Sequence, residues 1–314
     1  MPQVSGKIKI PNGKKIAVNI GCDFDAQAIW IGSFNLTSPA YMSRGEFGAE
    51  VAVPRLLKLF DKHRIKTTWC IPGHTVDTWP ELCREIVSAG HEIGHHGYVH
   101  ENPTPMSLAE ETKVMQMGLE ALSRIGVKPR VYRSPYWDFS PNTLSILEEY
   151  GFSADSSLMG NDFHPYVIRR VEIHADRGNV FGSSSKVLEI PVSWYLDDFP
   201  PEEYITGKQE GMNPAVGIFD RWKAIFDYAL ANETGACYVV TTHPQTIGRA
   251  HMIFPARRVA RVHCRQGSVV RNPRRDLRRD RDSQIATGRR FSYRSARRNL
   301  WIRQLTFARG TVGQ

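Results

Sequence analysis

Short apolar runs alternate with amphipathic stretches between residues 16 and 242. Residues 16–23 form a β-branched run that ends at polar side chains, which predicts a strand. Residues 107–126 open with a serine three positions before Glu110, a capping-box pattern, and end at a glycine, which predicts a helix. Further strands are predicted at 66–73, 91–96, 129–135, 152–157, 186–194 and 236–243, and further helices at 47–63, 78–90, after Pro141 and near 219–232. This order predicts an α/β fold whose parallel sheet is covered by helices, as a barrel or a doubly wound sheet.

Polar side chains that can bind metal or transfer protons follow the apolar runs repeatedly. They are Asp23 and Asp25 after the first run, His95, His96 and His100 after the third, then Arg133 and Tyr136, Trp194, and His243. Because the carboxyl ends of parallel strands meet at one face, we expect these side chains to lie close together.

One aspartate and two histidines in this set form a candidate metal site. Asp25 ends an apolar run, and His96 and His100 are four residues apart, a spacing that can chelate one metal if the segment is helical. Asp23 lies two residues before Asp25, so that both carboxylates can face one site, with Asp23 as general base. The alternatives are a turn or helix cap for the aspartates and a solvent-facing pair for the histidines.

Three nitrogen and oxygen ligands leave one coordination position for water. Such a site lowers the pKa of the bound water and produces a hydroxide nucleophile near neutral pH. A set of nitrogen and oxygen ligands without a thiolate favours Zn²⁺, with Co²⁺, Fe²⁺ and Ni²⁺ as alternatives.

The motifs together resemble those of a known family. The segments CDFDA, HHGYVH, RSPYWDFSP, EIPVSW and TTHP are similar, in the same order, to the motifs of the polysaccharide deacetylase (NodB-homology) family. The resemblance runs from about Lys15 to Arg249 and is nearest to a subgroup of Helicobacter peptidoglycan-deacetylase-like proteins, cyclic imidases and a metal-dependent allantoinase. It implies a distorted (β/α)₇ barrel over residues 1–250 and hydrolysis of amide C–N bonds other than peptide bonds.

The resemblance also implies a role for each polar residue of the motifs. It places the catalytic base at Asp23, the metal ligands at Asp25, His96 and His100, and the general acid at His243, which protonates the leaving nitrogen. Arg133 would orient the base, and the backbone N–H of Tyr136 would stabilise the oxyanion. Trp194, Trp137 and Trp30 would line the substrate pocket, although Trp194 could equally be a core residue.

Two positions depart from the family pattern or stand beside it. Phe24 separates the two aspartates that are adjacent in the common motif, as in the imidase-like subgroup. His95 adds a second imidazole next to the first histidine ligand, and it either supports that ligand or is exposed.

Substrate and location are constrained by what the sequence lacks. It has no apolar run of about 18 residues, no signal peptide and no CxxC among its five cysteines, which predicts a cytoplasmic protein without a membrane span. We therefore expect a small amide or cyclic imide as substrate, with N-acetylglucosamine-containing glycan as the alternative. A non-catalytic metal-binding relative is an alternative of another class. The resemblance implies a homotetramer. The segment Ile31–Gly48 is expected to be a long loop, which is either a plain connection or a lid or subunit contact at the rim of the site.

The C-terminal residues 251–314 differ in composition from the rest of the chain. They hold 17 Arg, no Lys, three Asp and no Glu, a net charge of +14, whereas residues 1–250 carry −5. Basic segments that bind nucleic acid usually mix Lys with Arg, so nucleic acid is not the expected partner. Permitted codons for residues 255–266, read one base later, encode an amphipathic helix. We hypothesise that the reading frame shifts near 251–254 and that the tail is out of frame and poorly ordered.

Overall fold

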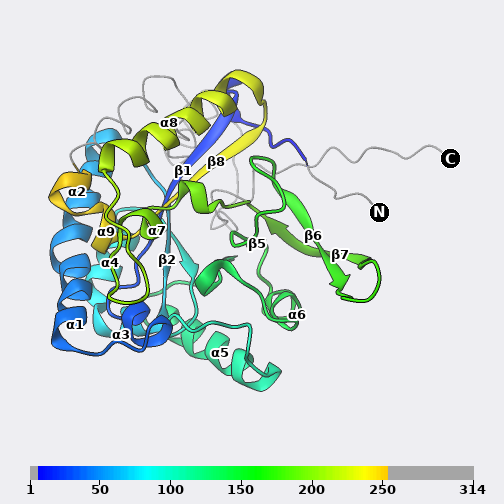
Figure 1. Ribbon diagram of the computed structural model, residues 1–314, viewed down its shortest axis with the longest axis horizontal. Helices are drawn as coiled ribbons and strands as arrows, with labels where there is room; N and C mark the ends of the chain where they lie inside the picture. The colour runs from blue at the N-terminus through cyan, green and yellow to red at the C-terminus, as the bar shows by residue number, and fades with distance from the viewer. Residues whose placement is uncertain (1–5, 254–314) are drawn as a thin grey trace, which may run out of the picture.

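The computed structural model describes residues 6–253 as an α/β fold built on one sheet (Figure 1). The strand order is β6-β7-β5-β4-β3-β2-β1-β8. The strands are β1 Ile16–Asp23, β2 Thr68–Ile71, β3 Glu92–His95, β4 Val131–Tyr132, β5 Ala154–Asp155, β6 Tyr166–Glu172, β7 Val180–Glu189 and β8 Ala236–Thr242. The tail expected from the sequence lies almost wholly outside the described residues.

Every strand pairing in this sheet is parallel except that of β6 with β7, which is antiparallel. These seven parallel strands match the number expected for the family. At the far side of the series, Asp197, which follows β7, forms a parallel bridge with Thr241 of β8. The chain segments after β7 and within β8 therefore meet along one seam, which brings together the two ends of the parallel series.

Helices connect the strands, as the alternating pattern predicts. They are α1 Pro39–Glu46, α2 Val53–His63, α3 Gly73–Thr78, α4 Pro80–Ser88, α5 Leu108–Arg124, α6 Thr143–Glu149, α7 Phe199–Glu202, α8 Ala215–Asn232 and α9 Pro244–Ile247. The α5 capping box is present, with the Ser107 and Glu110 side chains each bonded to the other's backbone N–H. None of the helices in residues 6–253 is long and apolar enough to span a bilayer.

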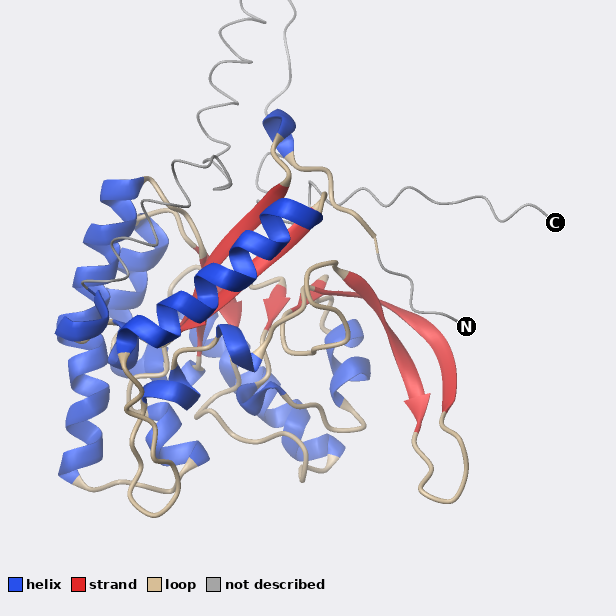
Figure 2. Ribbon diagram, turned by 45° about the horizontal axis from the view of Figure 1, so that its top comes forward, coloured by secondary structure: helices blue, strands red, loops and turns tan. Residues whose placement is uncertain are grey.

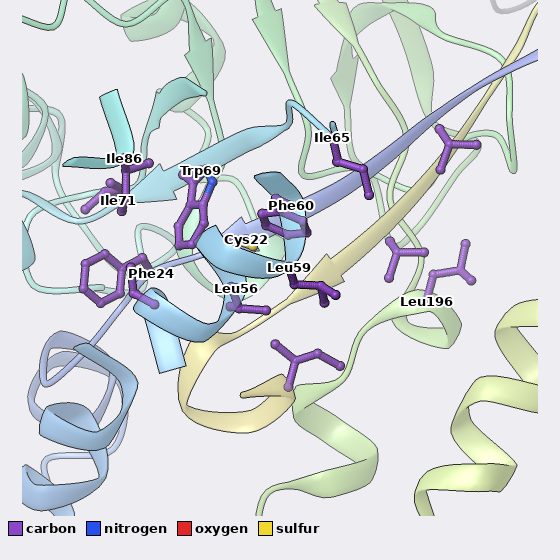
Figure 3. Packing of buried hydrophobic residues seen from close by; sticks show 14 of the residues in the cluster. Cys22, Phe24, Leu56, Leu59, Phe60, Ile65, Trp69, Ile71, Ile86 and Leu196 are labelled. Atoms are coloured by element: carbon purple, nitrogen blue, oxygen red, sulfur yellow. The ribbon is translucent and has the colours of Figure 1, made fainter. Parts of the chain in front are cut away.

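The largest apolar cluster lies between the sheet and the helices that cover it (Figure 3). Trp69 of β2 is fully buried and makes edge-to-face contacts with Phe24 and with Phe60 of α2. Phe24, the residue that separates the two aspartates, is itself fully buried. Its side chain thus belongs to the core, while the carboxylates on either side of it belong to the site.

Some segments differ from the sequence expectations. The strand expected at 186–194 is β7, Val180–Glu189, so it begins and ends earlier than predicted. The segment 31–48, expected to be a long loop, is largely helical: it contains the end of the π-helical turn η2 (Ile29–Ser33), helix α1 and the start of η3 (Phe47–Ala52). Pro39 occupies the first turn of α1, where its missing N–H costs nothing. Strand β6 was not predicted, and with β7 it forms an antiparallel hairpin that extends away from the helices (Figure 2).

Candidate active site

The expected reactive side chains do meet at the carboxyl ends of the parallel strands. Asp23 ends β1, His96 follows β3, Arg133 follows β4 and His243 follows β8. All four are almost completely buried. Because Asp23 ends a paired strand and the other three directly follow one, the sheet restrains the backbone of each.

Asp25, His96 and His100 form a compact cluster of possible metal ligands. The Asp25 Oδ1 atom lies 3.6 Å from His96 Nε2 and 4.0 Å from His100 Nε2. Donor atoms of a tetrahedral site with bonds near 2.0–2.1 Å are separated by about 3.4 Å, so small adjustments suffice to bind one ion. Within residues 6–253, neither Asp25 oxygen nor His96 Nε2 has a hydrogen-bond partner, although all three atoms are buried.

The other nitrogen of each histidine explains why Nε2 can serve as a ligand. His96 Nδ1 lies 2.7 Å from the Arg133 carbonyl oxygen, which can only accept, so Nδ1 carries the hydrogen and Nε2 has a free lone pair. His100 Nδ1 contacts the Ser33 hydroxyl at 2.5 Å. Hydrogen bonds of this kind fix the orientation of metal-binding histidines.

The electrostatics of the cluster fit a cation. Burial lowers the pKa of His96 to about 3, so its ring is neutral, as a ligand must be. Burial also raises the pKa of Asp25 well above its ordinary value. An ionised carboxylate with no partner is costly to bury, and a bound divalent metal would remove that cost. The residues therefore fit a divalent metal with oxygen and nitrogen ligands.

Asp23 is held on the other side of His96 by Arg133. The Asp23 Oδ2 atom lies 3.9 Å from His96 Nε2, and Oδ1 accepts a hydrogen bond of 2.7 Å from Arg133 Nη1. Arg133 is fixed in turn by Ser156, whose carbonyl and hydroxyl oxygens accept from its Nε and Nη2 atoms at 2.8 and 2.9 Å. Oδ2 of Asp23 is thus free to face the cluster while Oδ1 is anchored.

His243 approaches the second oxygen of Asp25. Its Nε2 atom lies 3.8 Å from Asp25 Oδ2, and its Nδ1 atom lies 2.7 Å from Asp198 Oδ1. Burial by itself lowers the pKa of His243, but the Asp197 and Asp198 carboxylates outweigh it and raise the pKa well above the ordinary value. The raised pKa favours the protonated ring, which is the form that the proposed general acid requires.

Asp198 was not found by sequence reasoning. Its carboxylate also accepts the His243 backbone N–H at 2.9 and 3.1 Å. Asp197, Asp198 and His243 could formally be taken for a second metal cluster. The hydrogen bonds to Asp198 satisfy it without an ion, whereas the Asp25 oxygens have none. The adjacent acids in the segment WYLDDFP were the only sequence signal.

The histidine segment has a different backbone from the one that its spacing suggested. Residues 96–100 are not helical, and Gly97 and His100 adopt positive φ values of 69° and 63°. This tight loop turns His100 back toward Asp25. His95 is fully buried, with Nε2 3.1 Å from the Met115 carbonyl oxygen and Nδ1 accepting from Gly97 N. Of the two alternatives for His95, the structure shows the supporting one.

The three tryptophans expected around the substrate lie in different surroundings. Trp137 and Trp194 stack with ring centroids 4.3 Å apart, and Trp194 is 43% exposed. Trp30 has no exposed surface and packs against Tyr41 and Phe199. Its position differs from the expectation, because a ring enclosed in an aromatic cluster cannot touch a substrate.

Tyr136 lies beside the candidate metal cluster. Its ring centroid is 5.9 Å from that of His100, and its hydroxyl donates to the Ser33 carbonyl oxygen at 2.6 Å. Its φ of 63° is unusual for a residue with a side chain. Such strain is often kept where a backbone group has to be aimed at a ligand.

Comparison with known proteins gives the same picture. Residues 45–154 match the family model described as polysaccharide deacetylase. The chain is 37% identical to peptidoglycan deacetylase of Helicobacter pylori, over 77% of this chain and 87% of that protein. It is 30% identical to the peptidoglycan deacetylase-like protein FGM2 of Gibberella zeae, over 76% of this chain and 78% of that protein.

Solved structures agree with the sequence relatives. A Mycobacterium smegmatis protein assigned to the polysaccharide deacetylases has a TM-score of 0.75 and 30% identity, over 93% of this chain and 99% of that one. Puue allantoinase shares the fold, with a TM-score of 0.67 and 23% identity over 87% of this chain and 92% of the allantoinase. The chain belongs to the polysaccharide deacetylase family and is a hydrolase of carbon–nitrogen bonds other than peptide bonds.

Proposed function

We propose that this protein is a metal-dependent amidohydrolase that removes the acetyl group from an N-acetylated sugar. One observation carries the metal dependence: the Asp25 carboxylate is fully buried, accepts no hydrogen bond from residues 6–253, and lies 3.6 and 4.0 Å from the Nε2 atoms of His96 and His100. The sugar is supported by the 37% identical relative, which is named a peptidoglycan deacetylase.

Each residue of the site has a step that it can perform. A divalent ion held by Asp25, His96 and His100 would polarise the amide carbonyl and lower the pKa of a coordinated water. Asp23 accepts the proton of the attacking water, with Arg133 fixing the carboxylate through its other oxygen. His243, oriented by Asp198, donates a proton to the departing nitrogen. The backbone N–H of Tyr136 is the proposed oxyanion donor.

A second substrate class is favoured by the covering of the site. Asp23, Asp25 and His96 are each at most 1% exposed. Next to them, the Tyr136 hydroxyl donates a hydrogen bond to the Ser33 carbonyl oxygen. A covered site favours a small amide or cyclic imide over a polymer. That substrate also fits a cytoplasmic location, which remains a prediction from the sequence.

A hydrolysis panel tests both substrate classes. Metal-stripped protein is reloaded with Zn²⁺, Co²⁺, Fe²⁺ or Ni²⁺ and assayed against N-acetylglucosamine oligomers, succinimide, hydantoin and allantoin. We expect amine release from the oligomers that depends on added metal. Ring opening without deacetylation would select the second class, and undiminished activity in stripped protein would refute the metal-dependent mechanism.

A further inference from the structure

The segment after β1 contacts the candidate metal site twice. Asp25 supplies a ligand, and eight residues later the chain returns to the site at Ser33, the last residue of the π-helical turn Ile29–Ser33. The sequence motifs do not single out Ser33, but its contacts in the folded protein do.

The Ser33 hydroxyl makes two contacts with one residue, His100. It donates to the His100 carbonyl oxygen at 3.0 Å and lies 2.5 Å from His100 Nδ1. Because a hydroxyl has one hydrogen, both contacts are satisfied together only when Nδ1 carries a hydrogen and donates it. The Nε2 lone pair of His100 is then free, and this atom lies 4.0 Å from Asp25 Oδ1.

The backbone beside Ser33 is fitted closely to the same loop. A Cβ added to Gly32 would lie 1.9 Å from the Val99 carbonyl oxygen and 3.1 Å from the His100 carbonyl carbon. Only glycine permits that approach. The Ser33 carbonyl oxygen accepts the Tyr136 hydroxyl at 2.6 Å, so the same residue also touches the loop that carries the proposed oxyanion donor.

From these contacts we infer that Ser33 is a positioning residue that fixes the tautomer and orientation of His100 and links it to the Tyr136 loop. The inference rests on the proposed metal site. His100 needs such support because its positive φ places it in a tight loop instead of on a regular element. His96 has the equivalent support from the Arg133 carbonyl oxygen.

Zinc affinity tests this role independently of turnover. The dissociation constant of Zn²⁺ is measured by competition with a chromophoric chelator for the parent protein, Ser33→Ala, Ser33→Thr and Ser43→Ala. Loss of a hydrogen bond that supports a metal-binding histidine typically weakens binding about 10–100-fold, which is the expected result for Ser33→Ala. Ser33→Thr retains the hydroxyl and should restore most of the affinity. Ser43 lies on α1, and within residues 6–253 its hydroxyl bonds only to the Ala40 carbonyl oxygen in the same helix, so Ser43→Ala should match the parent.

The outcomes separate the inference from the metal site itself. If the parent binds no zinc, the proposed metal site fails and the role of Ser33 fails with it. If the parent binds zinc and Ser33→Ala binds it equally well, only the role of Ser33 is refuted. A Ser33→Ala variant with a lower thermal midpoint in chelator but parental zinc affinity would show a merely structural role and would also refute the inference.

Discussion

The two aspartates near the end of β1 have the same side chain but different surroundings. Asp23 is paired with Arg133 at 2.7 Å, whereas the carboxylate of Asp25 accepts no hydrogen bond from any residue in 6–253. A carboxylate that already has a fixed cation beside it can serve as a base. One that is buried and accepts no hydrogen bond is better suited to bind a metal ion.

This difference predicts that neutralising each aspartate has a different effect. Asp23→Asn keeps an oxygen for Arg133 but cannot accept a proton, so kcat should fall by roughly 10²–10⁴ while zinc affinity stays near the parental value. Asp25→Ala should abolish zinc binding and activity together. Parallel calorimetric titrations and initial rates measure both. Equal loss of metal from the two variants would contradict the assignment.

Residue types and spacing were enough to find some members of the site but not others. Asp25, His96 and His100 belong to residue types that bind metals, and they follow apolar runs, so the sequence indicates them. Ser33 and Asp198 are of common types and act through contacts with distant segments. Such contacts depend on the tertiary fold, which the local pattern does not contain.

At the scale of elements, helix α5 packs against the start of the loop 96–100, which carries His96 and His100. Gly118 of α5 faces this loop so closely that an added Cβ would lie 2.2 Å from His95 Nε2 and 2.8 Å from the Gly97 carbonyl oxygen. The glycine therefore sets the distance between the helix and the strand end that carries His96. Helical periodicity predicted α5 well, but it gave no sign of this contact.

Gly118→Ala is accordingly expected to destabilise the protein. Alanine is favoured over glycine by about 1 kcal/mol in a helix interior, but the clash should outweigh this gain and give a net loss of roughly 1–3 kcal/mol. Zinc affinity should also fall as the loop shifts. Gly217→Ala is the matched control on α8, because nothing lies within 4 Å of the added Cβ. Urea unfolding of both variants measures their free energies of unfolding. A Gly118→Ala protein as stable as Gly217→Ala would contradict the packing argument.

The residue that precedes β3 predicts a pH dependence of stability. His91 is buried against Phe60 and Trp69, and burial, aided by Lys66, lowers its pKa to about 4. Between pH 4 and 6.5 the unfolded chain therefore binds a proton at this site that the folded protein does not. This contribution to stability is present above pH 6.5 and is lost as the pH falls toward 4.

A comparison with His91→Phe isolates this effect. The stability of the parent relative to the variant should decrease by roughly 3 kcal/mol between pH 6.5 and pH 4, because one pKa unit corresponds to about 1.4 kcal/mol. Urea unfolding at several pH values measures the difference. A relative stability that is independent of pH would show that His91 is protonated equally in both states.

Elements with a clear period were predicted well, whereas two segments were not. The strands at 16–23 and 236–243 and helix α5 all appear close to their expected places. The segment 29–52 has many polar and small residues, and its helical turns are stabilised by packing of Trp30 and Phe34 against Phe199. Strand β6 is stabilised by pairing with β7, a partner that a local pattern does not reveal.

For the whole molecule, the buried Asp25 carboxylate, which accepts no hydrogen bond from residues 6–253, predicts that metal binding and stability are linked. Zinc at about 100 times its dissociation constant should stabilise the fold by about 2.7 kcal/mol. The thermal midpoint of stripped protein should therefore rise as zinc is added, and that of Asp25→Ala should stay constant. Scanning calorimetry across a zinc series is the measurement, and parallel shifts in both proteins would place the ion elsewhere.

The seam between the segment after β7 and strand β8 has a consequence for how activity could be lost. His243, the proposed proton donor, and its partner Asp198 lie on opposite sides of this seam, and the Asp198 N–H donates to the Thr241 carbonyl oxygen at 3.3 Å. A transient opening there would part the pair while His96 and His100, carried by β3 and the loop after it, stay in place. Amide hydrogen exchange at Asp198 would then report how often the proposed proton donor is displaced while the proposed metal ligands remain in place.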